Sequence, residues 1–270
     1  MTAPLSLTKH HALGNDFLVT FDSVCGDAAA LARRICDRRR GIGADGLLMG
    51  TDDPDRIDGV TMRLINADGS PAEMSGNGIR CFAQALAMRR GSMADQRIIT
   101  DAGVRLVTLA AAGPNRIEAT VAMGPVSDLD ETPGWAEIGA DPMRPVAHLS
   151  LGNPHCVVGV EDIASVDLAA LGGRLPQVNV EIVEPGPAPD AITMRVHERG
   201  AGITEACGTG ACASAFAARR WGLVPATASE IVVHMDGGDA RVRFTDQGEA
   251  ILTGPADYVG SVRWEMTQGE

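Results

Sequence analysis

Two short glycine-rich loops carry the side chains most suited to chemistry. Residues 73–81 read EMSGNGIRC and residues 205–212 read EACGTGAC, so that Ser75 of the first loop corresponds to Cys207 of the second. In both loops a glycine, a polar residue and a second glycine follow, and then a run of small and apolar residues typical of a helix. Backbone N–H groups and the dipole at the start of a helix favour a bound anion. The two loops are therefore predicted to hold a carboxylate together, with a hydroxyl on one side and a thiol on the other.

Cys207 is the candidate base. A helix N-terminus lowers the pKa of a thiol from about 8.5 towards neutrality, so we expect a reactive thiolate here. The α-proton of an amino acid is very weakly acidic, and its removal requires preorganised donors in a site without bulk water. Paired helix N-termini supply such donors. Because Lys9 is the only lysine and pyridoxal phosphate is attached through a lysine Schiff base, we expect this chemistry to need no cofactor.

Three polar residues near the loops have two interpretations each. His155 follows Gly152-Asn153-Pro154 and could tune a thiol or simply complete a turn. Glu198 and Arg199 could form a surface pair, or could meet an ammonium and a carboxylate at the end of a strand. A single glycine-flanked helix start occurs in many folds for packing alone. The repetition of the motif favours the functional interpretation.

The composition limits the class of protein. With 270 residues, 45% of them hydrophobic, the chain can form one or two cores of roughly 130 residues each. The formal net charge of −12 argues against a nucleic-acid or anionic-membrane surface. No apolar run is long enough to span a membrane, and the first residues show no secretion signal. We expect a cytoplasmic globular protein whose partner is a small molecule.

The six cysteines are expected to be free thiols, because none of them forms a C-x-x-C pair in this signal-free sequence. For the same reason we expect no zinc or other metal site. Five of the thiols are interpreted as structural, mostly core, residues: Cys25, Cys36, Cys81, Cys156 and Cys212.

The two loops lie in halves of similar pattern. Arg63-Leu64-Ile65-Asn66 corresponds to Arg195-Val196-His197-Glu198, and Gly14-Asn15 corresponds to Gly152-Asn153. A repeat of half a chain length indicates duplication. We therefore predict an α+β fold of two pseudo-symmetric half-domains, each a mostly antiparallel sheet around a central helix, with the active-site cleft between them. The N-terminal half-domain is expected to comprise residues 1–123 and 259–270, and the C-terminal one residues 124–258.

Within these halves the pattern predicts specific elements. The central helices are expected at about 77–90 and 209–221. A hairpin is expected over 5–21, and a helix capped by Asp27 is expected to run to about Arg38. Single strands are predicted at 98–108, 250–253 and 262–266, whereas 128–145 shows no clear pattern.

Taken in order, several motifs closely resemble those of the diaminopimelate epimerase family, and they span nearly the whole chain. They are His11-Ala12-Leu13-Gly14-Asn15-Asp16-Phe17, Gly41-Ile42-Gly43-Ala44-Asp45, Asn66-Ala67-Asp68-Gly69-Ser70, Ser75-Gly76-Asn77-Gly78-Ile79-Arg80-Cys81, Gly152-Asn153-Pro154-His155, Glu198-Arg199-Gly200 and Cys207-Gly208-Thr209-Gly210-Ala211-Cys212.

The resemblance implies a cofactor-independent enzyme that interconverts LL- and meso-2,6-diaminopimelate in lysine and peptidoglycan precursor biosynthesis. One thiolate would remove the α-proton and a thiol on the opposite face would return one, with Cys207 as one of the pair. His155 and Glu198 would adjust the thiols. The amides of Gly76 and Asn77, and of Gly208 and Thr209, would hold the reacting carboxylate. The resemblance implies that the remaining substrate contacts come from Asn15, Asn66, Asn153, Asn179, Glu198 and Arg199. A homodimer is a further expectation.

The sequence departs from the family pattern at Ser75, where the first catalytic cysteine would stand. A serine hydroxyl without assistance is a poor base near neutral pH. Ser75 could be a natural variant that relays protons at reduced rate, it could be an engineered change, or Cys207 could be the single base. Gly46 is a milder departure, at a position where some members carry a glutamine that contacts substrate.

Two other functions stay open at this point. One is a relative of the proline racemase and hydroxyproline dehydratase group, in which serine or threonine can replace one cysteine and the reaction becomes elimination. The other is an impaired protein that binds an amino acid without turning it over. The motifs at Asn66–Ser70 and Glu198–Gly200 favour the epimerase.

Overall fold

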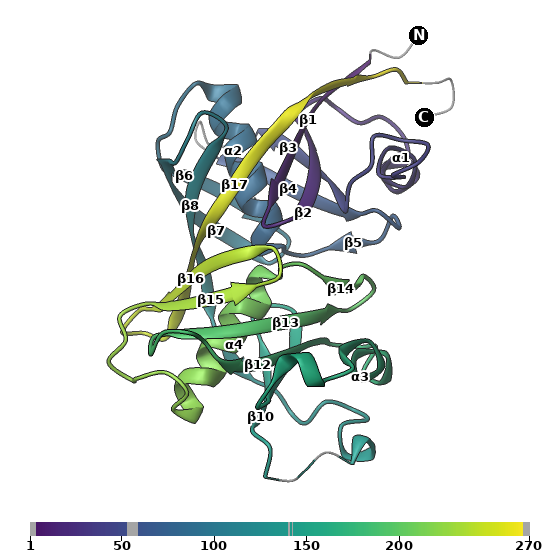
Figure 1. Ribbon diagram of the computed structural model, residues 1–270. Coiled ribbons are helices and arrows are strands. Elements are labelled where there is room, and N and C mark those ends of the chain that lie inside the picture. The colour runs from purple at the N-terminus through teal and green to yellow at the C-terminus, as the bar shows by residue number, and fades with distance from the viewer. Residues whose placement is uncertain (1–3, 53–58, 140, 142, 267–270) are drawn as a thin grey trace. The chain divides into compact units, whose positions relative to one another are not determined.

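Many strands and a few helices make up the chain, as the predicted α+β class requires (Figure 1). The structure is a computed structural model that describes residues 4–52, 59–139, 141 and 143–266. The chain divides into two compact units. Unit 1 holds the described residues within Met1–Val121 and Gly254–Glu270, and unit 2 is Ala122–Thr253. The parts of the predicted N-terminal half-domain at 1–3 and 267–270 lie outside the described residues.

Unit 1 begins with a hairpin, as predicted, whose turn places Leu13 and Gly14 at positive φ. Its elements are β1 (Leu5–Ala12), β2 (Asn15–Thr20), α1 (Ala28–Ile35), β3 (Gly46–Asp52), β4 (Gly59–Asn66), β5 (Pro71–Ala72), α2 (Gly76–Arg90), β6 (Gln96–Thr100), β7 (Gly103–Ala111) and β8 (Arg116–Pro125), which leads into unit 2.

Unit 2 contains a second set of the same kind. Its elements are β9 (Ser127–Asp128), η1 (Ala136–Ile138), β10 (Val146–Ser150), β11 (Pro154–Gly159), η2 (Ile163–Ser165), α3 (Leu168–Arg174), β12 (Asn179–Pro185), β13 (Ala191–Glu198), β14 (Gly202–Thr204), α4 (Gly208–Trp221), β15 (Ile231–Met235), β16 (Gly238–Phe244) and β17 (Glu249–Trp264), which returns to unit 1.

The units share their strand pairing. Antiparallel pairs β1–β2, β3–β4 and β6–β7 of unit 1 correspond to β10–β11, β12–β13 and β15–β16 of unit 2. Two parallel pairs, β2–β3 and β4–β6, correspond to β11–β12 and β13–β15. The ladders are therefore mostly antiparallel, and the departures from that rule occur at equivalent places in both units.

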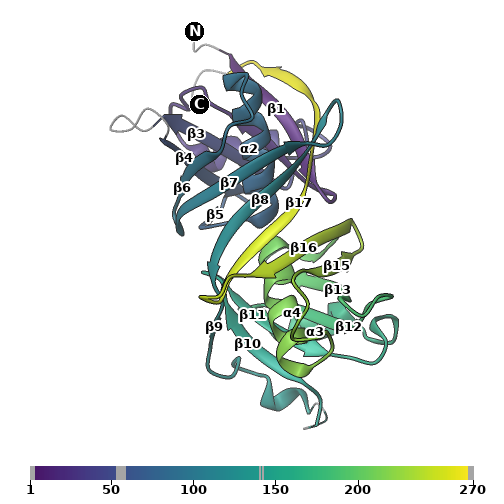
Figure 2. The same ribbon diagram turned by 90° about the vertical axis from the view of Figure 1, so that its left-hand side faces the viewer.

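The central strands are buried on both faces, which a strand achieves only when other elements cover both sides of its sheet. In β2 every residue after Asn15 is buried, and β11 shows the same pattern after Pro154. In unit 1 the apolar face of α1 packs into a core with residues of β1 to β4, and α2 also contacts β1 and β2. In unit 2 α3 and α4 both contact β12 and β13 (Figure 2).

The central helices are confirmed, and each begins one residue earlier than predicted. Residues 76–87 of α2 are buried, and so are most residues of α4. Such all-round burial suits their small and apolar residues. Each helix ends at a glycine in the left-handed conformation, Gly91 or Gly222, whose N–H caps the last turn. The helices are therefore rigid supports for the loops that precede them.

Three predicted elements differ from the structure. The strand predicted at 98–108 is the hairpin β6–β7, because the chain turns before Gly103 at positive φ and Thr100 closes that turn by donating to the Gly103 carbonyl. The strands predicted at 250–253 and 262–266 are one continuous strand, β17, because it pairs with β16 and then with β1. Helix α1 ends at Ile35 rather than Arg38, because the Gly43 N–H donates a hydrogen bond to the Ile35 carbonyl.

Candidate functional site

In unit 2, Cys207 is the N-cap of α4. Its Sγ accepts a hydrogen bond from Gly210 N–H at 3.3 Å and lies 3.4 Å from Thr209 Oγ1. The side chain is almost fully buried, with 5% of the residue exposed. Gly208 and Thr209 form the first turn of the helix, where backbone N–H groups have no partner within the helix. The loop thus places a sulfur beside donors for an anion, as the sequence predicts.

The expected lowering of the Cys207 pKa is wrong for this structure. Burial raises the pKa of the thiol well above its ordinary value, and the nearby carboxylates of Glu198 and Glu181 raise it further. The hydrogen bonds from Thr209 and Gly210 act in the opposite direction. The helix N-terminus is therefore outweighed by loss of solvent and by two acidic neighbours that the loop sequence does not contain. Near neutral pH the thiol holds its proton.

Glu198, at the end of β13, is the nearest acceptor for that proton. Its carboxylate is hydrogen bonded to Cys207, and Thr204 Oγ1 donates to its Oε1 at 2.5 Å. Burial raises the pKa of Glu198 above its ordinary value. The hydrogen bond gives the thiol proton a direct path to a carboxylate, which is the geometry that general base catalysis requires.

A second buried acid lies behind the thiol. Glu181 of β12 is fully buried, and its Oε1 lies 2.7 Å from His155 Nδ1. His155 Nε2 lies 3.1 Å from Asn153 Oδ1, and Asn153 Nδ2 donates to Thr209 Oγ1 at 3.2 Å. His155 could tune a thiol or simply complete a turn. In the structure its imidazole is fully buried in a polar network that Asn153 links to the α4 loop, so its contacts extend beyond a turn.

Asn179 and Arg199 meet at the edge of the same region. Asn179 Oδ1 accepts from the Arg199 backbone N–H at 2.9 Å, and its Nδ2 donates to the Pro154 carbonyl at 3.3 Å. Register explains the proximity, because β12 pairs with both β11 and β13, which places Asn179 opposite His155. Unit 2 thus brings together its predicted residues: Asn153, His155, Asn179, Glu198, Arg199, Cys207, Gly208 and Thr209.

In unit 1, Ser75 is the N-cap of α2 with the same geometry. Its φ and ψ are −136° and 122°, against −132° and 115° for Cys207. Ser75 Oγ accepts from Gly78 N–H at 2.9 Å. Ser75 is half-buried, whereas Gly76 and Asn77 are buried. The Ser75 hydroxyl therefore stands at the N-cap of α2 as the Cys207 thiol stands at the N-cap of α4.

A polar network supports the α2 loop. Asn77 Nδ2 donates to Asn15 Oδ1 at 3.3 Å, and Arg80 donates to Asn77 Oδ1 at 2.9 Å and to the Gly76 carbonyl at 3.0 Å. Asn15 Nδ2 in turn donates to Asp45 Oδ2 at 2.7 Å. Both amides are thereby fixed in orientation.

The network extends to charged residues around Asp16. Lys9 and Arg38 both form ion pairs with Asp16, and Arg38 also contacts Asp45. Burial alone would raise the pKa of Asp16, but hydrogen bonds and charge from Arg38 and Lys9 hold it below its ordinary value. Asn66 of β4 lies nearby in register with Gly46, and its Nδ2 donates to Ser70 Oγ at 3.0 Å.

The sequence does not predict three residues that hold the site residues in place, namely Glu181, Asp45 and Arg80. Glu181 had a usable signal, because it is the one charge inside the otherwise apolar and amide run 178–183. An acid at such a position is buried and needs a partner. Arg80 is fully buried within α2, and a charged residue in a helix with small neighbours carries no comparable signal.

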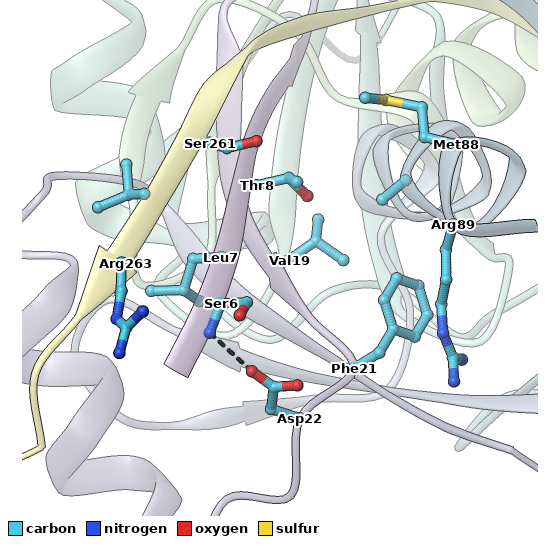
Figure 3. A pocket seen from close by; sticks show the side chains of 12 residues that line it. Ser6, Leu7, Thr8, Val19, Phe21, Asp22, Met88, Arg89, Ser261 and Arg263 are labelled. Atoms are coloured by element: carbon cyan, nitrogen blue, oxygen red, sulfur yellow. Dashed lines mark hydrogen bonds between the residues drawn. The ribbon is translucent and has the colours of Figure 1, made fainter. Parts of the chain in front are cut away.

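A hollow of about 630 Å³ in unit 1 lies apart from these residues (Figure 3). It is lined by parts of β1, β2 and β17 and by Ala85, Met88 and Arg89, near the end of α2. Ser75 precedes the first residue of that helix, so at about 1.5 Å per residue the two places are about 20 Å apart. None of the predicted site residues lines the hollow.

Among the described residues, no cluster of three or more histidine, cysteine, aspartate or glutamate side chains is suited to hold a metal ion. None of the helices in the described part of the chain is both long and apolar enough to cross a membrane.

The fold is similar to that of several solved structures. A PhzF-family phenazine biosynthesis protein from Bacillus anthracis superposes with a TM-score of 0.76, covering 98% of this chain and all of that one, at 15% identity. A hydroxyproline epimerase from Agrobacterium vitis, with bound trans-4-hydroxy-L-proline, gives a TM-score of 0.70 at 15% identity, covering 100% of this chain and 93% of that chain. At such identities the likeness concerns the fold alone.

Comparison with sequences is more specific. The family profile described as diaminopimelate epimerase matches residues 7–129 and 148–259. Diaminopimelate epimerase from Synechococcus elongatus is 38% identical, covering 97% of this chain and 99% of the relative. The enzyme of that name from Desulfitobacterium hafniense is 36% identical over 94% of this chain and 96% of its own. Together with the two capped loops, these matches show that the chain belongs to the diaminopimelate epimerase family.

Proposed function

We propose that this protein interconverts LL-2,6-diaminopimelate and meso-2,6-diaminopimelate by moving a proton at one α-carbon without a cofactor. Family membership over nearly the whole chain supports this activity. The observation that carries the mechanism is the buried Cys207 thiol at the start of α4, hydrogen bonded to the Glu198 carboxylate.

In the proposed mechanism Glu198 and Cys207 act as one acid–base pair. Because the thiol is protonated near neutral pH, it can give its proton to a carbanion, and Glu198 then supplies a proton to the thiolate. In the reverse direction Glu198 takes the thiol proton, and the thiolate removes the α-proton. Gly210 N–H and Thr209 stabilise the sulfur anion in either direction. The pair thus passes one proton to the carbanion in the first direction and gains one from the α-carbon in the reverse direction, and the negative charge that remains in the pair is carried by Glu198 at the end of the first direction.

The substrate contacts are part of the proposal. The backbone N–H groups in the first turns of α2 and α4, at Gly76 and Asn77 and at Gly208 and Thr209, would hold the reacting carboxylate. The other proposed contacts come from Asn15, Asn66, Asn153, Asn179, Glu198 and Arg199. The described hydrogen bonds that fix the Asn15 and Asn153 amides support this proposal, because a fixed amide presents one defined group to a ligand.

We extend the proposal to the two halves. The half-domains 1–123 with 259–270, and 124–258, would close over one substrate, so that Ser75 and Cys207 address opposite faces of its α-carbon. The matching N-cap geometries support equivalent roles for the two positions. We also expect the enzyme to act in the cytoplasm, where its thiols stay reduced, and to form a homodimer, which sedimentation would test.

Ser75 sets the expected rate. A hydroxyl without a base is a much weaker proton acceptor than a thiolate, and within unit 1 no described carboxylate or imidazole is hydrogen bonded to Ser75 Oγ. Proton transfer on that face is therefore expected to be slow, either through Ser75 itself or through water next to it. Exchange by Cys207 alone is expected to be faster than inversion.

Incubation of the protein with LL-diaminopimelate in heavy water tests the proposal. We expect deuterium at the α-carbon and formation of the meso isomer, read by mass spectrometry and chiral chromatography. Exchange without inversion would identify a one-base enzyme. Binding without exchange would identify a protein that holds the amino acid but does not act on it.

The specific observation of Ser75 favours one alternative, an elimination of the hydroxyproline dehydratase kind, in which a serine replaces one cysteine. Incubation with trans-3- and trans-4-hydroxyprolines separates the two functions. Loss of water from a hydroxyproline, together with no exchange on diaminopimelate, would support the alternative and reject the epimerase.

Substitution of the proposed base gives a direct prediction. Cys207→Ala should reduce α-proton exchange by several orders of magnitude, because no other group replaces the thiol as base. Cys25→Ser, which changes an exposed thiol, serves as the control and should keep the exchange rate. Normal exchange in Cys207→Ala would refute the assignment of the base.

A further inference from the structure

We propose that Thr204 is a positioning residue, whose hydroxyl holds the Glu198 carboxylate as the proton acceptor for the Cys207 thiol. The hydroxyl acts through Glu198 and is not itself an acid or a base in the proposed steps. The inference rests on the proposed function, because it concerns the base of that reaction. All three residues lie in unit 2.

The hairpin of β13 and β14 puts the two side chains on one face (Figure 1). Thr204 lies opposite Val196. Residues directly opposite each other in an antiparallel pair point to the same face, and so do alternate residues of one strand. Glu198 follows Val196 by two residues, so it is a diagonal neighbour of Thr204 on that face. A long side chain can reach across such a diagonal.

The same face meets the loop that carries the thiol. Glu181 of β12 also lies opposite Val196, and α4 contacts both β12 and β13. Strand β14 ends at Thr204, only three residues before Cys207. The hairpin therefore brings the acid and the start of α4 together, with the hydroxyl beside the acid.

The hydrogen bond has one possible direction when Glu198 is ionised. Thr204 Oγ1 lies 2.5 Å from Glu198 Oε1. An ionised carboxylate only accepts, so the Thr204 O–H donates. A hydrogen bond to a charged acceptor is stronger than one to a neutral acceptor, and the contact therefore favours the ionised acid. Rotation of the carboxylate would break this bond, so the acid is held in an orientation that also reaches Cys207.

The surroundings of Glu198 show why it needs this support. The titratable groups that face it are Glu181 of β12, His155 of β11 and Cys207 at the start of α4. Burial raises the pKa of Glu198, and the nearby Glu181 raises it further. The hydrogen bond from Thr204 is the largest influence that lowers it. Without the hydroxyl, Glu198 would stay protonated over a wider pH range and could not take the thiol proton there.

Unit 1 contains the same hairpin without this pair. The register of β4 with β5 corresponds to that of β13 with β14. Ala72 stands there in the place of Thr204, and a methyl group donates no hydrogen bond. Asn66 stands in the place of Glu198. The acid and its hydroxyl donor therefore occur together in the unit that carries Cys207.

A titration without substrate tests the inference. The protein is labelled with carbon-13 at the glutamate side-chain carboxyl groups, and the Glu198 signal is identified by its absence in Glu198→Gln. Thr204→Val keeps the shape of the side chain but removes the donor, so the pKa of Glu198 should rise by about one pH unit. Thr204→Ser keeps the hydroxyl and should retain the parent value. Valine is favoured in strands, and Thr204→Ala provides a second variant without the donor.

The pH dependence of α-proton exchange provides the second measurement. In Thr204→Val the acid limb should move to higher pH by the same amount, so that exchange at a pH on that limb is about tenfold slower. Thr204→Ser should follow the parent profile. Adding Thr204→Val to Glu198→Gln should cause no further loss, because the hydroxyl acts through the acid.

Two results would overturn the inference. An unchanged pKa of Glu198 in both Thr204→Val and Thr204→Ala would show that the hydroxyl does not support the acid. An equal rise in Thr204→Ser would assign the effect to packing of the methyl group. If the parent protein exchanged no α-proton of diaminopimelate, the proposed function would fail instead, and the titration would still decide whether Thr204 holds Glu198 in its ionised form.

Discussion

At Ser75 and Cys207 the same backbone geometry holds two side chains of very different acidity. Ser75 Oγ accepts from Gly78 N–H at 2.9 Å, and Cys207 Sγ accepts from Gly210 N–H at 3.3 Å. The longer contact reflects the size of sulfur rather than a different turn. A thiol therefore fits the N-cap position of α2 without a change in the loop.

This fit leads to the prediction for Ser75→Cys. The variant should raise epimerisation strongly, by about a hundredfold or more, because a thiol is far easier to ionise than a hydroxyl. Chiral chromatography of the diaminopimelate isomers measures the rate. Ser75→Ala is the matched control, and it should not show the gain. An unchanged or lower rate in Ser75→Cys would indicate a mechanism that does not use this position.

The acid–base pair in unit 2 predicts a pH effect. Glu198 must be ionised to take the thiol proton, and burial raises its pKa. The exchange rate should therefore fall as the pH falls through this raised value. Glu198→Gln should lose about a hundredfold or more in exchange and should also lose this acid limb of the pH profile. A variant that keeps the acid limb would assign it to another group.

The sequence predicts the two N-cap residues of α2 and α4 better than the residues that surround them. Ser75 and Cys207 stand in repeated motifs, whereas Glu181 is brought to the same region by the pairing of β12 with β11 and β13. The Cys207 pKa was misjudged for the same reason. A helix start is visible in the sequence, but the burial of the thiol and its two acidic neighbours arise from strand register.

At the scale of elements, local signals predicted the helices well. Asp27 caps α1 through its carboxylate, which accepts from the N–H groups of Ala29 and Ala30. Helices α2 and α4 are followed by Gly91 and Gly222 in the left-handed conformation, and a glycine in this conformation commonly ends a helix. The strands were predicted less well, because the length of a strand depends on its partners. β17 is continuous since β16 and β1 pair with successive parts of it.

His10 of β1 makes unit 1 sensitive to acid. Its ring is fully buried between Gln84 and Thr8, and burial lowers its pKa from 6.5 to about 4. The unfolded chain therefore binds a proton between pH 6.5 and 4 that the folded chain does not. The contribution of His10 to the free energy of unfolding is fully present above pH 6.5, and it decreases by roughly 3 kcal/mol as the pH falls towards 4.

Urea unfolding at pH 7 and at pH 4.5, followed by circular dichroism, measures this effect. His10→Gln has no such titration, so its free energy of unfolding should fall less between the two pH values. The carboxylates titrate in both proteins, so the difference between the two falls in unfolding free energy reports on His10 alone. An equal fall in both proteins would contradict the assignment to His10.

At the scale of the whole molecule, the proposed closure of the half-domains predicts a cross-link. In Ser75→Cys, mild oxidation should form a disulfide between positions 75 and 207, with loss of activity that dithiothreitol restores. The parent protein lacks the first thiol and should resist the same oxidation. Failure to form the disulfide in an active Ser75→Cys variant would contradict the proposal that both side chains act on one α-carbon.

Motif pairs such as Gly14-Asn15 and Gly152-Asn153 predict a repeat of half a chain length. The structure shows units with the same element order and the same parallel and antiparallel pairs. The boundary of unit 1 near Gly254 could not be read from the sequence, because β17 runs through it without a break.

The pairing of β1 with β17 makes unit 1 depend on its last strand. Leu5 lies opposite Trp264 and Leu7 opposite Val262. Val262→Pro should remove a ladder hydrogen bond and destabilise this edge. Hydrogen exchange should then speed up in β1, while β12 and β13 of unit 2 keep their protection and serve as an internal control. Equal effects in both units would show that they unfold together.

The same pairing orders the events of biosynthesis. Unit 2 is a continuous stretch and has all of its residues once Thr253 has left the ribosome, whereas β1 must wait for its partner strand β17, whose paired residues follow unit 2 in the sequence. A nascent chain would thus expose this edge of β1 until β17 has been synthesised. Unit 1 is therefore completed only after unit 2, although β1 precedes all of unit 2 in the sequence.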